Sequence, residues 1–118
     1  MNNQLQATWE RYVSSWKVQS SADKKAIFKN CLTPTCEYTD PLAKTKGWDE
    51  LATYMLNFHE QVPNAYFVTT YFLAHNQKGI AKWEMTNDAG VILGDGVSYS
   101  EYNDEGKLTV ITGFYETP

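Results

Sequence analysis

The stretch that decides the fold is residues 66–116, YFVTTYFLAHNQKGIAKWEMTNDAGVILGDGVSYSEYNDEGKLTVITGFYE. Runs rich in Tyr, Phe, Val and Thr alternate there with short turn-forming segments. The runs are Tyr66 to His75, Ile80 to Thr86, Val91 to Tyr102 and Lys107 to Glu116, and the separators are Asn76 to Gly79, Asn87 to Gly90 and Asn103 to Gly106. β-Branched and aromatic residues favour strands, whereas Asn, Asp and Gly favour turns. The stretch predicts four consecutive strands in an antiparallel meander.

Two glycines stand inside the third of these runs, at Gly94 and Gly96. A glycine within a strand pattern marks a bulge or a sharp bend, because it has no side chain to pack on the sheet. We therefore expect the meander to be strongly curved.

The residues that precede the meander have helical periodicity. Apolar residues at steps of three and four predict a first helix with one strongly aromatic face, formed by Leu5, Trp9, Tyr12, Val13 and Trp16. A shorter second helix is expected after Ser20–Asp23, with Ala26, Ile27, Cys31 and Leu32 on its apolar face and Pro34 as its end. A third is expected from the spacing of Leu51, Tyr54, Met55, Phe58 and Val62, and it ends at Pro63 and Asn64.

Between the second and third helices, the alternating segment Thr35 to Thr39 predicts an extended strand. Asp40 precedes Pro41, which disfavours helical dihedral angles at Asp40 and places it at a strand end or bend. Ala43 to Gly47 is predicted to be a polar loop.

Helices first and strands after, without βαβ alternation, indicate an α+β fold. We predict one domain, residues 1–118, in which a cone-shaped curved antiparallel sheet wraps around the N-terminal helices. A bent meander covered by three helices on its concave side leaves a conical space between the two layers.

Composition excludes several classes of function. The 118 residues are 42% hydrophobic and 20% charged, which is typical of a folded globular domain. The net charge of −4 argues against nucleic acid and acidic membrane surfaces as partners. The N-terminus resembles no secretory signal and no apolar run is long enough to span a membrane, so we expect a soluble, cytoplasmic protein. Cys31 and Cys36 are interpreted as small buried hydrophobic residues rather than as a disulfide framework or a zinc site.

Taken together, these features resemble the nuclear transport factor 2-like superfamily, and most of all its SnoaL-like and ketosteroid-isomerase-like members. The resemblance runs over nearly the whole chain. It rests on the first helix with Tyr12, the strand ending in Tyr38-Thr39-Asp40-Pro41, the helix led by Gly47, the meander, and the turn Asp104-Glu105-Gly106-Lys107. It implies a cystatin-like α+β barrel whose open end admits a small apolar ligand, and a homodimer formed through the outer face of the sheet. Gly94-Asp95-Gly96 lacks the third glycine and the following helix of a dinucleotide-binding motif, so we expect no cofactor.

The resemblance also implies roles for individual residues. In isomerase relatives an Asp at the Asp-Pro step shuttles a proton beside a carbonyl, and a Tyr of the first helix stabilises the enolate oxygen. These roles correspond to Asp40 and Tyr12 here. The relatives' second oxyanion donor, a carboxylic acid, aligns with Ser98, and the nearby Asp95 has the opposite strand parity. Which of these two residues replaces that donor stays open.

Each candidate also has a purely structural interpretation. Asp40 could be a turn carboxylate, and Tyr12 could be a core tyrosine whose hydroxyl finds a partner elsewhere. The walls of the predicted cavity could equally be core packing, and they are Trp9, Trp16, Tyr38, Met55, Phe58 and Trp83, the last sharing its strand face with Ala81 and Met85. His59 is a minor candidate for acid–base chemistry at the cavity rim or a solvated boundary residue, and His75 is expected to be exposed.

The functional hypothesis is a small-molecule-binding protein that acts as a cofactor-independent isomerase or polyketide-cyclase-type enzyme. Asp40 would be the proton-shuttling base on an apolar, cyclic or aromatic carbonyl compound. The Asp-Arg-Asp arrangement of epoxide hydrolases is disfavoured, because Arg11 is the only arginine and lies off the apolar face. We expect no metal ion. The alternative hypothesis is a non-catalytic ligand carrier or an oligomerisation module of the same fold.

Overall fold

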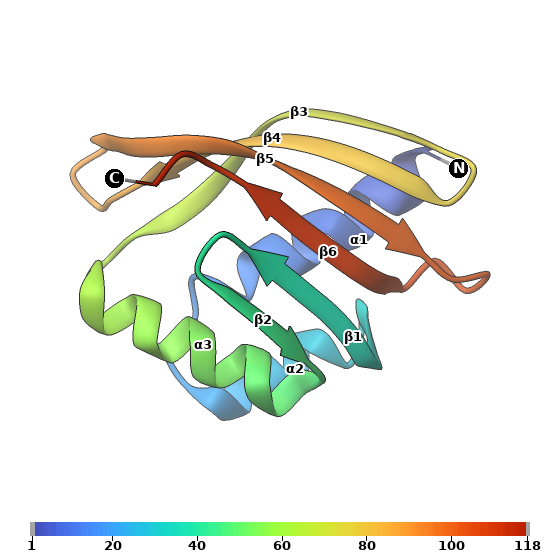
Figure 1. Ribbon diagram of the computed structural model, residues 1–118, viewed down its shortest axis with the longest axis horizontal. Coiled ribbons are helices and arrows are strands. Elements are labelled where there is room, and N and C mark those ends of the chain that lie inside the picture. The colour runs from blue at the N-terminus through green and yellow to red at the C-terminus, as the bar shows by residue number, and fades with distance from the viewer. Residues whose placement is uncertain (1, 118) are drawn as a thin grey trace.

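A computed structural model describes residues 2–117 and confirms the α+β class. Three helices and six strands follow one another in the order α1 (Asn2–Ser14), α2 (Ser21–Phe28), β1 (Leu32–Asp40), β2 (Ala43–Lys46), α3 (Trp48–Gln61), β3 (Tyr66–His75), β4 (Lys78–Thr86), β5 (Ile92–Tyr102) and β6 (Leu108–Phe114). Figure 1 shows a curved sheet with the helices on one side of it, where α1 crosses behind the strands.

The strands form one sheet in the order β2-β1-β6-β5-β4-β3. The meander from β3 to β6 is antiparallel throughout, as predicted. The sheet was predicted to be antiparallel and no partner was predicted for the first strand, but the structure pairs β1 with β6 in parallel. The sheet is therefore mixed, and it remains unclosed with β2 and β3 at its two edges.

Two local predictions are corrected by the structure. The second helix ends at Phe28, and the first strand already begins at Leu32 and runs through Pro34. The register against β6 shifts between Leu32 and Glu37, and Pro34 has no paired residue there. Proline is tolerated at this position because no hydrogen bond between strands needs its missing N–H group. The predicted polar loop contains a second strand, Ala43–Lys46, which pairs with β1 and buries Thr45.

Gly94 and Gly96, the two glycines predicted to mark a bulge or bend, both lie on β5. The register between β4 and β5 shifts after Met85, which confirms a bulge close to Gly94. Gly96 lies opposite Trp83, and its lack of a side chain leaves room for the indole. A Cβ atom at Gly96 would overlap the Trp83 ring and stand 2.7 Å from the Phe114 carbonyl oxygen. The Trp83 ring and the backbone of β6 thus approach Gly96 too closely for any side chain at that position.

Gly96→Ala is expected to lower the free energy of unfolding by about 1–3 kcal/mol, because the added methyl group displaces backbone as well as the indole. Gly94→Ala is the matched control, since a Cβ atom there meets only the Met85 methyl group, at 3.9 Å. That variant is expected to change stability by less than about 1 kcal/mol. Denaturant titration of both proteins checks the difference, and equal stabilities would contradict the described contact.

The outer face of the sheet carries exposed apolar side chains. Tyr71 of β3 and Phe114 of β6 are about half exposed, whereas Phe67 turns inward onto the aromatic interior. Leu73 pairs with Ile80, and both are exposed as well. The outer face therefore offers apolar surface that no other part of residues 2–117 covers. Within those residues, no helix has the length and apolar character needed to cross a membrane.

Candidate functional site

Asp40 lies at the end of β1, where the turn into β2 begins. Its Oδ1 atom accepts hydrogen bonds from the backbone amides of Leu42 (2.8 Å) and Ala43 (3.0 Å). Its Oδ2 atom accepts hydrogen bonds from the hydroxyl groups of Tyr38 (2.7 Å) and Tyr54 (2.8 Å). The turn-carboxylate interpretation is thus correct for one oxygen, while the other oxygen faces two phenols.

The tyrosines around this carboxylate come from three parts of the chain. Tyr38 is on β1, Tyr54 is on α3, and Tyr115 follows β6. Burial raises the pKa of Tyr38 and of Tyr54, and the hydrogen bond to Asp40 raises both further. Burial and the charge of Asp40 also raise the pKa of Tyr115. At neutral pH all three phenols are therefore protonated, and Tyr38 and Tyr54 donate their hydrogen bonds to Asp40. We call these four residues the Asp40 cluster.

The hydrogen bonds of Asp40 limit what its carboxylate can do. An ionised carboxylate has about four lone-pair positions, and Asp40 uses four for the two amides and two phenols. A fifth group can reach the carboxylate only when one donor turns away. The two amides are held by the chain, whereas Tyr54 is only half-buried. Tyr54 is accordingly the donor that can leave most readily.

Tyr12 does not join the Asp40 cluster by a hydrogen bond. It is buried, and its hydroxyl accepts a hydrogen bond of 2.9 Å from the indole nitrogen of Trp16. Burial raises the pKa of Tyr12, and the charge of Asp40 adds to this effect. Among the described residues, the hydroxyl partners of Asp40 are instead Tyr38 and Tyr54.

The predicted cavity walls come together in space, and their rings are packed against one another. Trp16 lies at the centre, with ring centroids 5.3 Å from those of both Phe58 and Phe67. Its ring also contacts those of Tyr38 at 5.9 Å and Tyr54 at 6.2 Å. Trp9 and Met55 are fully buried in the same core. The space on the inner side of the Asp40 cluster is thus occupied by aromatic side chains.

Ser98 and Asp95, the two candidates for the second oxyanion donor, lie in different surroundings. Ser98 is buried, and its hydroxyl accepts a hydrogen bond of 3.0 Å from the indole nitrogen of Trp83. A Cβ atom built at Gly113 would lie 3.6 Å from the Asp40 Cβ atom and 3.7 Å from the Ser98 hydroxyl oxygen. Ser98 therefore borders the Asp40 cluster across Gly113, whereas Asp95 is exposed.

The two histidines have different surroundings. His75 is exposed, as predicted. His59 is buried, so it lies neither at a rim nor in solvent. Its Nε2 atom is 2.7 Å from the Nζ atom of Lys24. Within residues 2–117 there is no group of three His, Cys, Asp or Glu side chains that could hold a metal ion.

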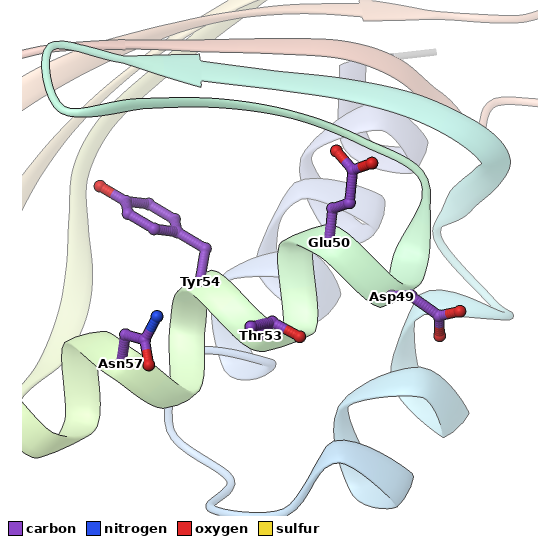
Figure 2. Close-up of a pocket in the computed structure, with 5 residues that line it drawn as sticks. All are labelled: Asp49, Glu50, Thr53, Tyr54 and Asn57. Atoms are coloured by element: carbon purple, nitrogen blue, oxygen red, sulfur yellow. The ribbon is translucent and has the colours of Figure 1, made fainter.

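A surface hollow of about 350 Å³ adjoins the cluster from the helical side. It is lined by α3 residues, namely Asp49, Glu50, Thr53, Tyr54 and Asn57. Figure 2 shows them along successive turns of α3, with Glu50 and Tyr54 directed toward the β1–β2 hairpin and Asp49 directed away from it. Tyr54 thus belongs both to the hollow and, through its hydroxyl, to the Asp40 cluster.

Tyr54 and Tyr115 were not predicted as site residues. Tyr54 was placed only on the apolar face of the third helix, three residues after Leu51 and four before Phe58. That spacing identifies an inward position, but it does not identify the polar partner that a tyrosine hydroxyl needs once it is buried. The neighbouring Tyr38-x-Asp40 pattern supplies the acceptor, which is the one signal that could have found the contact.

Comparison with known proteins identifies the family. The SnoaL-like domain matches residues 9–111. A protein of the SnoaL-like family from Agrobacterium tumefaciens, provisionally named an isomerase, has a TM-score of 0.88 at 18% identity, covering 98% of this chain and 99% of its own. A provisionally named SnoaL-like polyketide cyclase from Jannaschia has a TM-score of 0.79 at 13% identity. The alignment covers 98% of this chain and 87% of the cyclase.

A de novo designed protein with a curved β-sheet is also similar, with a TM-score of 0.75, 15% identity and coverage of 98% and 88%. No curated protein matches the sequence. At such identities the structural likeness establishes the fold alone. The match of residues 9–111 goes further, and the chain belongs to the family of SnoaL-like domains.

Proposed function

We propose that this protein binds a small carbonyl compound at the Asp40 cluster and moves a proton beside its carbonyl group, as an isomerase or a polyketide-cyclase-type enzyme would. The observation that supports this function most directly is the carboxylate oxygen of Asp40 held between the hydroxyl groups of Tyr38 and Tyr54. A base and a neutral hydrogen-bond donor side by side are the two groups that enolisation requires.

The proposed sequence of events begins with Tyr54. Its hydroxyl turns from Asp40 to the substrate oxygen, which frees one lone pair of Oδ2. Asp40 then removes a proton from the carbon next to the carbonyl, and the negative charge that moves to the oxygen is stabilised by the phenol. The protonated Asp40 returns this proton to another carbon of the enolate. The substrate is thereby isomerised, and both side chains return to their starting states.

Access to the cluster follows from the position of Tyr54. The aromatic rings around Trp16 fill the inner side, but Tyr54 borders the hollow beside α3. A ligand in that hollow contacts Tyr54 without unpacking the interior. In this proposal Tyr54 takes the oxyanion role that family resemblance assigns to Tyr12, because Tyr12 is bonded to Trp16.

The test measures exchange of hydrogen for deuterium at the carbon next to the carbonyl, by NMR in heavy water, on a panel of cyclic and aromatic ketones. Asp40→Asn is expected to lower the exchange rate by about 100-fold or more, since a general base contributes at least that factor. The side-chain oxygen of Asn can still accept hydrogen bonds from the backbone amides of Leu42 and Ala43, so the turn is retained. Unchanged exchange in Asp40→Asn would refute the proposal.

Two matched variants distinguish the phenols. Tyr54→Phe and Tyr38→Phe each remove one hydroxyl from the same carboxylate oxygen. The loss is expected to be larger for Tyr54→Phe, because Tyr38 is buried and Tyr54 reaches the hollow. If the folded wild-type protein exchanges no ketone of the panel, the second candidate is favoured, a non-catalytic module that associates through the exposed apolar outer face of the sheet.

A further inference from the structure

A second cluster of ionisable groups lies in the helical layer, away from Asp40. Lys24 of α2 is completely buried, with 0% of its surface exposed. Its Nζ atom donates hydrogen bonds to the carbonyl oxygens of Ser15 (2.8 Å) and Val18 (2.6 Å), just after the end of α1. The third contact of Nζ is the Nε2 atom of His59 on α3, at 2.7 Å. One lysine thus joins all three helices.

The contact between Lys24 and His59 accommodates only one positive charge. While Lys24 is an ammonium ion, Nε2 of His59 must be unprotonated to accept its hydrogen bond. Protonation of His59 would place two positive charges 2.7 Å apart in a buried site. Because Nε2 accepts this hydrogen bond, the proton of the neutral ring is on Nδ1, which is buried and has no hydrogen-bond partner among the described residues.

Neighbouring charges do not relieve this repulsion. Apart from Lys24 and His59, the charged side chains of the three packed helices are mostly exposed, and they are Glu10 and Arg11 on α1, Lys17 after it, Asp23 and Lys25 on α2, and Asp49, Glu50 and Glu60 on α3. Lys17 lies over the ring of Tyr66, and Lys25 forms an ion pair with Asp49. Across residues 2–117 no carboxylate forms an ion pair with Lys24. Burial and the charge of Lys24 both lower the pKa of His59.

Helix α2 depends strongly on this contact. Its eight residues, Ser21–Phe28, include only two that are buried, Lys24 and Phe28. A helix of that length has little stability of its own and needs tertiary packing. At the Lys24 end, the packing consists of polar contacts that one proton can disrupt. The carbonyl groups that Lys24 binds belong to residues on either side of Trp16, and His59 directly follows Phe58. The Lys24–His59 contact therefore fixes the backbone next to both rings of the Trp16–Phe58 pair.

We propose that the Lys24–His59 contact is an acid-operated latch: protonation of His59 releases α2 from α1 and α3 and uncovers the aromatic interior, while the sheet stays folded. The latch involves none of the residues of the Asp40 cluster, so it stands apart from the proposed chemistry. In the closed state the helical layer shields the rings of Trp16 and Phe58. In the open state this apolar surface becomes available to a hydrophobic molecule.

Hydrogen exchange followed by mass spectrometry, together with fluorescence of the dye anilinonaphthalene sulfonate, tests the latch between about pH 7.5 and pH 5. After correction for intrinsic exchange rates, the open fraction of residues 21–28 is expected to rise by up to about tenfold per pH unit, the slope of a one-proton equilibrium. Dye fluorescence should increase in parallel, and exchange in β4 and β5 should stay unchanged.

His59→Gln is the decisive variant, because the carboxamide oxygen can still accept a hydrogen bond from Lys24 but the side chain does not titrate. It is expected to abolish the acid response, whereas His75→Gln, which alters the exposed histidine, retains it. The same response in His59→Gln and wild type would overturn the latch. Should His59→Gln not fold, NMR titration of the His59 ring in the wild-type protein decides: protonation of the ring without increased exchange in residues 21–28 also overturns the proposal.

Discussion

Replacing Trp16 with alanine is expected to lower the free energy of unfolding by about 3–5 kcal/mol, the usual cost of deleting a large buried aromatic side chain. The ring contacts four aromatic neighbours, which are Tyr38, Tyr54, Phe58 and Phe67. Its indole nitrogen also donates the one hydrogen bond that the Tyr12 hydroxyl accepts. Thermal and denaturant unfolding of the variant measure the loss.

Trp16→Phe separates the two contributions, since it keeps a ring in place and removes only the donor to Tyr12. Its expected loss is smaller, about 1–3 kcal/mol, from the buried hydroxyl that loses a partner and the volume that the smaller ring leaves. A loss below about 1 kcal/mol in Trp16→Ala would mean that the aromatic rings are not packed as described.

The same variant probes the space beside the Asp40 cluster. Trp16→Ala leaves a cavity of indole shape next to Tyr38 and Tyr54, and apolar cavities of this kind bind aromatic molecules. Free indole is expected to stabilise Trp16→Ala by about 1.4 kcal/mol at ten times its dissociation constant, and to leave the wild type unchanged. Stabilisation of both proteins to the same extent would place the indole elsewhere.

Local signals in the sequence explain why the meander was predicted well. Each of its turns carries Asn and Gly, and each strand is rich in aromatic and β-branched residues, so Tyr66–His75 has the same bounds in prediction and structure. Residues 43–46 carry no such signal. They are extended because β1 pairs with them through Thr45 and its neighbours, and a pairing partner is a property of the folded chain. The parallel contact of β1 with β6 is non-local for the same reason.

The site was predicted in part. Asp40, Tyr38 and Trp16 do lie together, since strand alternation and helical spacing fix which way their side chains point. The hydrogen bonds from the Tyr38 and Tyr54 hydroxyl groups to Asp40 were not predictable. A tyrosine hydroxyl lies far from its backbone, and its position depends on the side-chain rotamer. Lys24 was overlooked because lysine is rarely buried. Its spacing, three residues before Ile27 and four before Phe28, nevertheless places it on the inner face of α2.

Burial of Lys24 leads to the second prediction, on the alkaline side of neutrality. Burial lowers the pKa of Lys24 from 10.5 to about 8. The unfolded chain therefore binds more protons than the folded chain between these two values, and the contribution of Lys24 to stability rises with pH across that interval. At about 1.4 kcal/mol per pKa unit, the cost of burying the charged lysine is about 3 kcal/mol at pH 8 and falls below about 1 kcal/mol at pH 10.

Wild-type stability alone does not show this gain, because other buried groups oppose it. Burial raises the pKa of Cys31 and Cys36 to about 12, so the folded state loses stability as the unfolded thiols ionise above pH 9. The buried tyrosines act in the same direction at higher pH, since their pKa values are raised as well. These groups are common to wild type and Lys24→Met, and their effects cancel in the difference between the two proteins.

Between pH 8 and pH 10, the wild type is therefore expected to gain about 2 kcal/mol of unfolding free energy relative to Lys24→Met. Denaturant titrations at fixed ionic strength measure this difference. Lys25→Met is the matched control, because it removes a neighbouring lysine that is partly exposed and paired with Asp49 at the surface. A difference that stays constant with pH would show that the Lys24 ammonium ion is stabilised fully by Ser15, Val18 and His59.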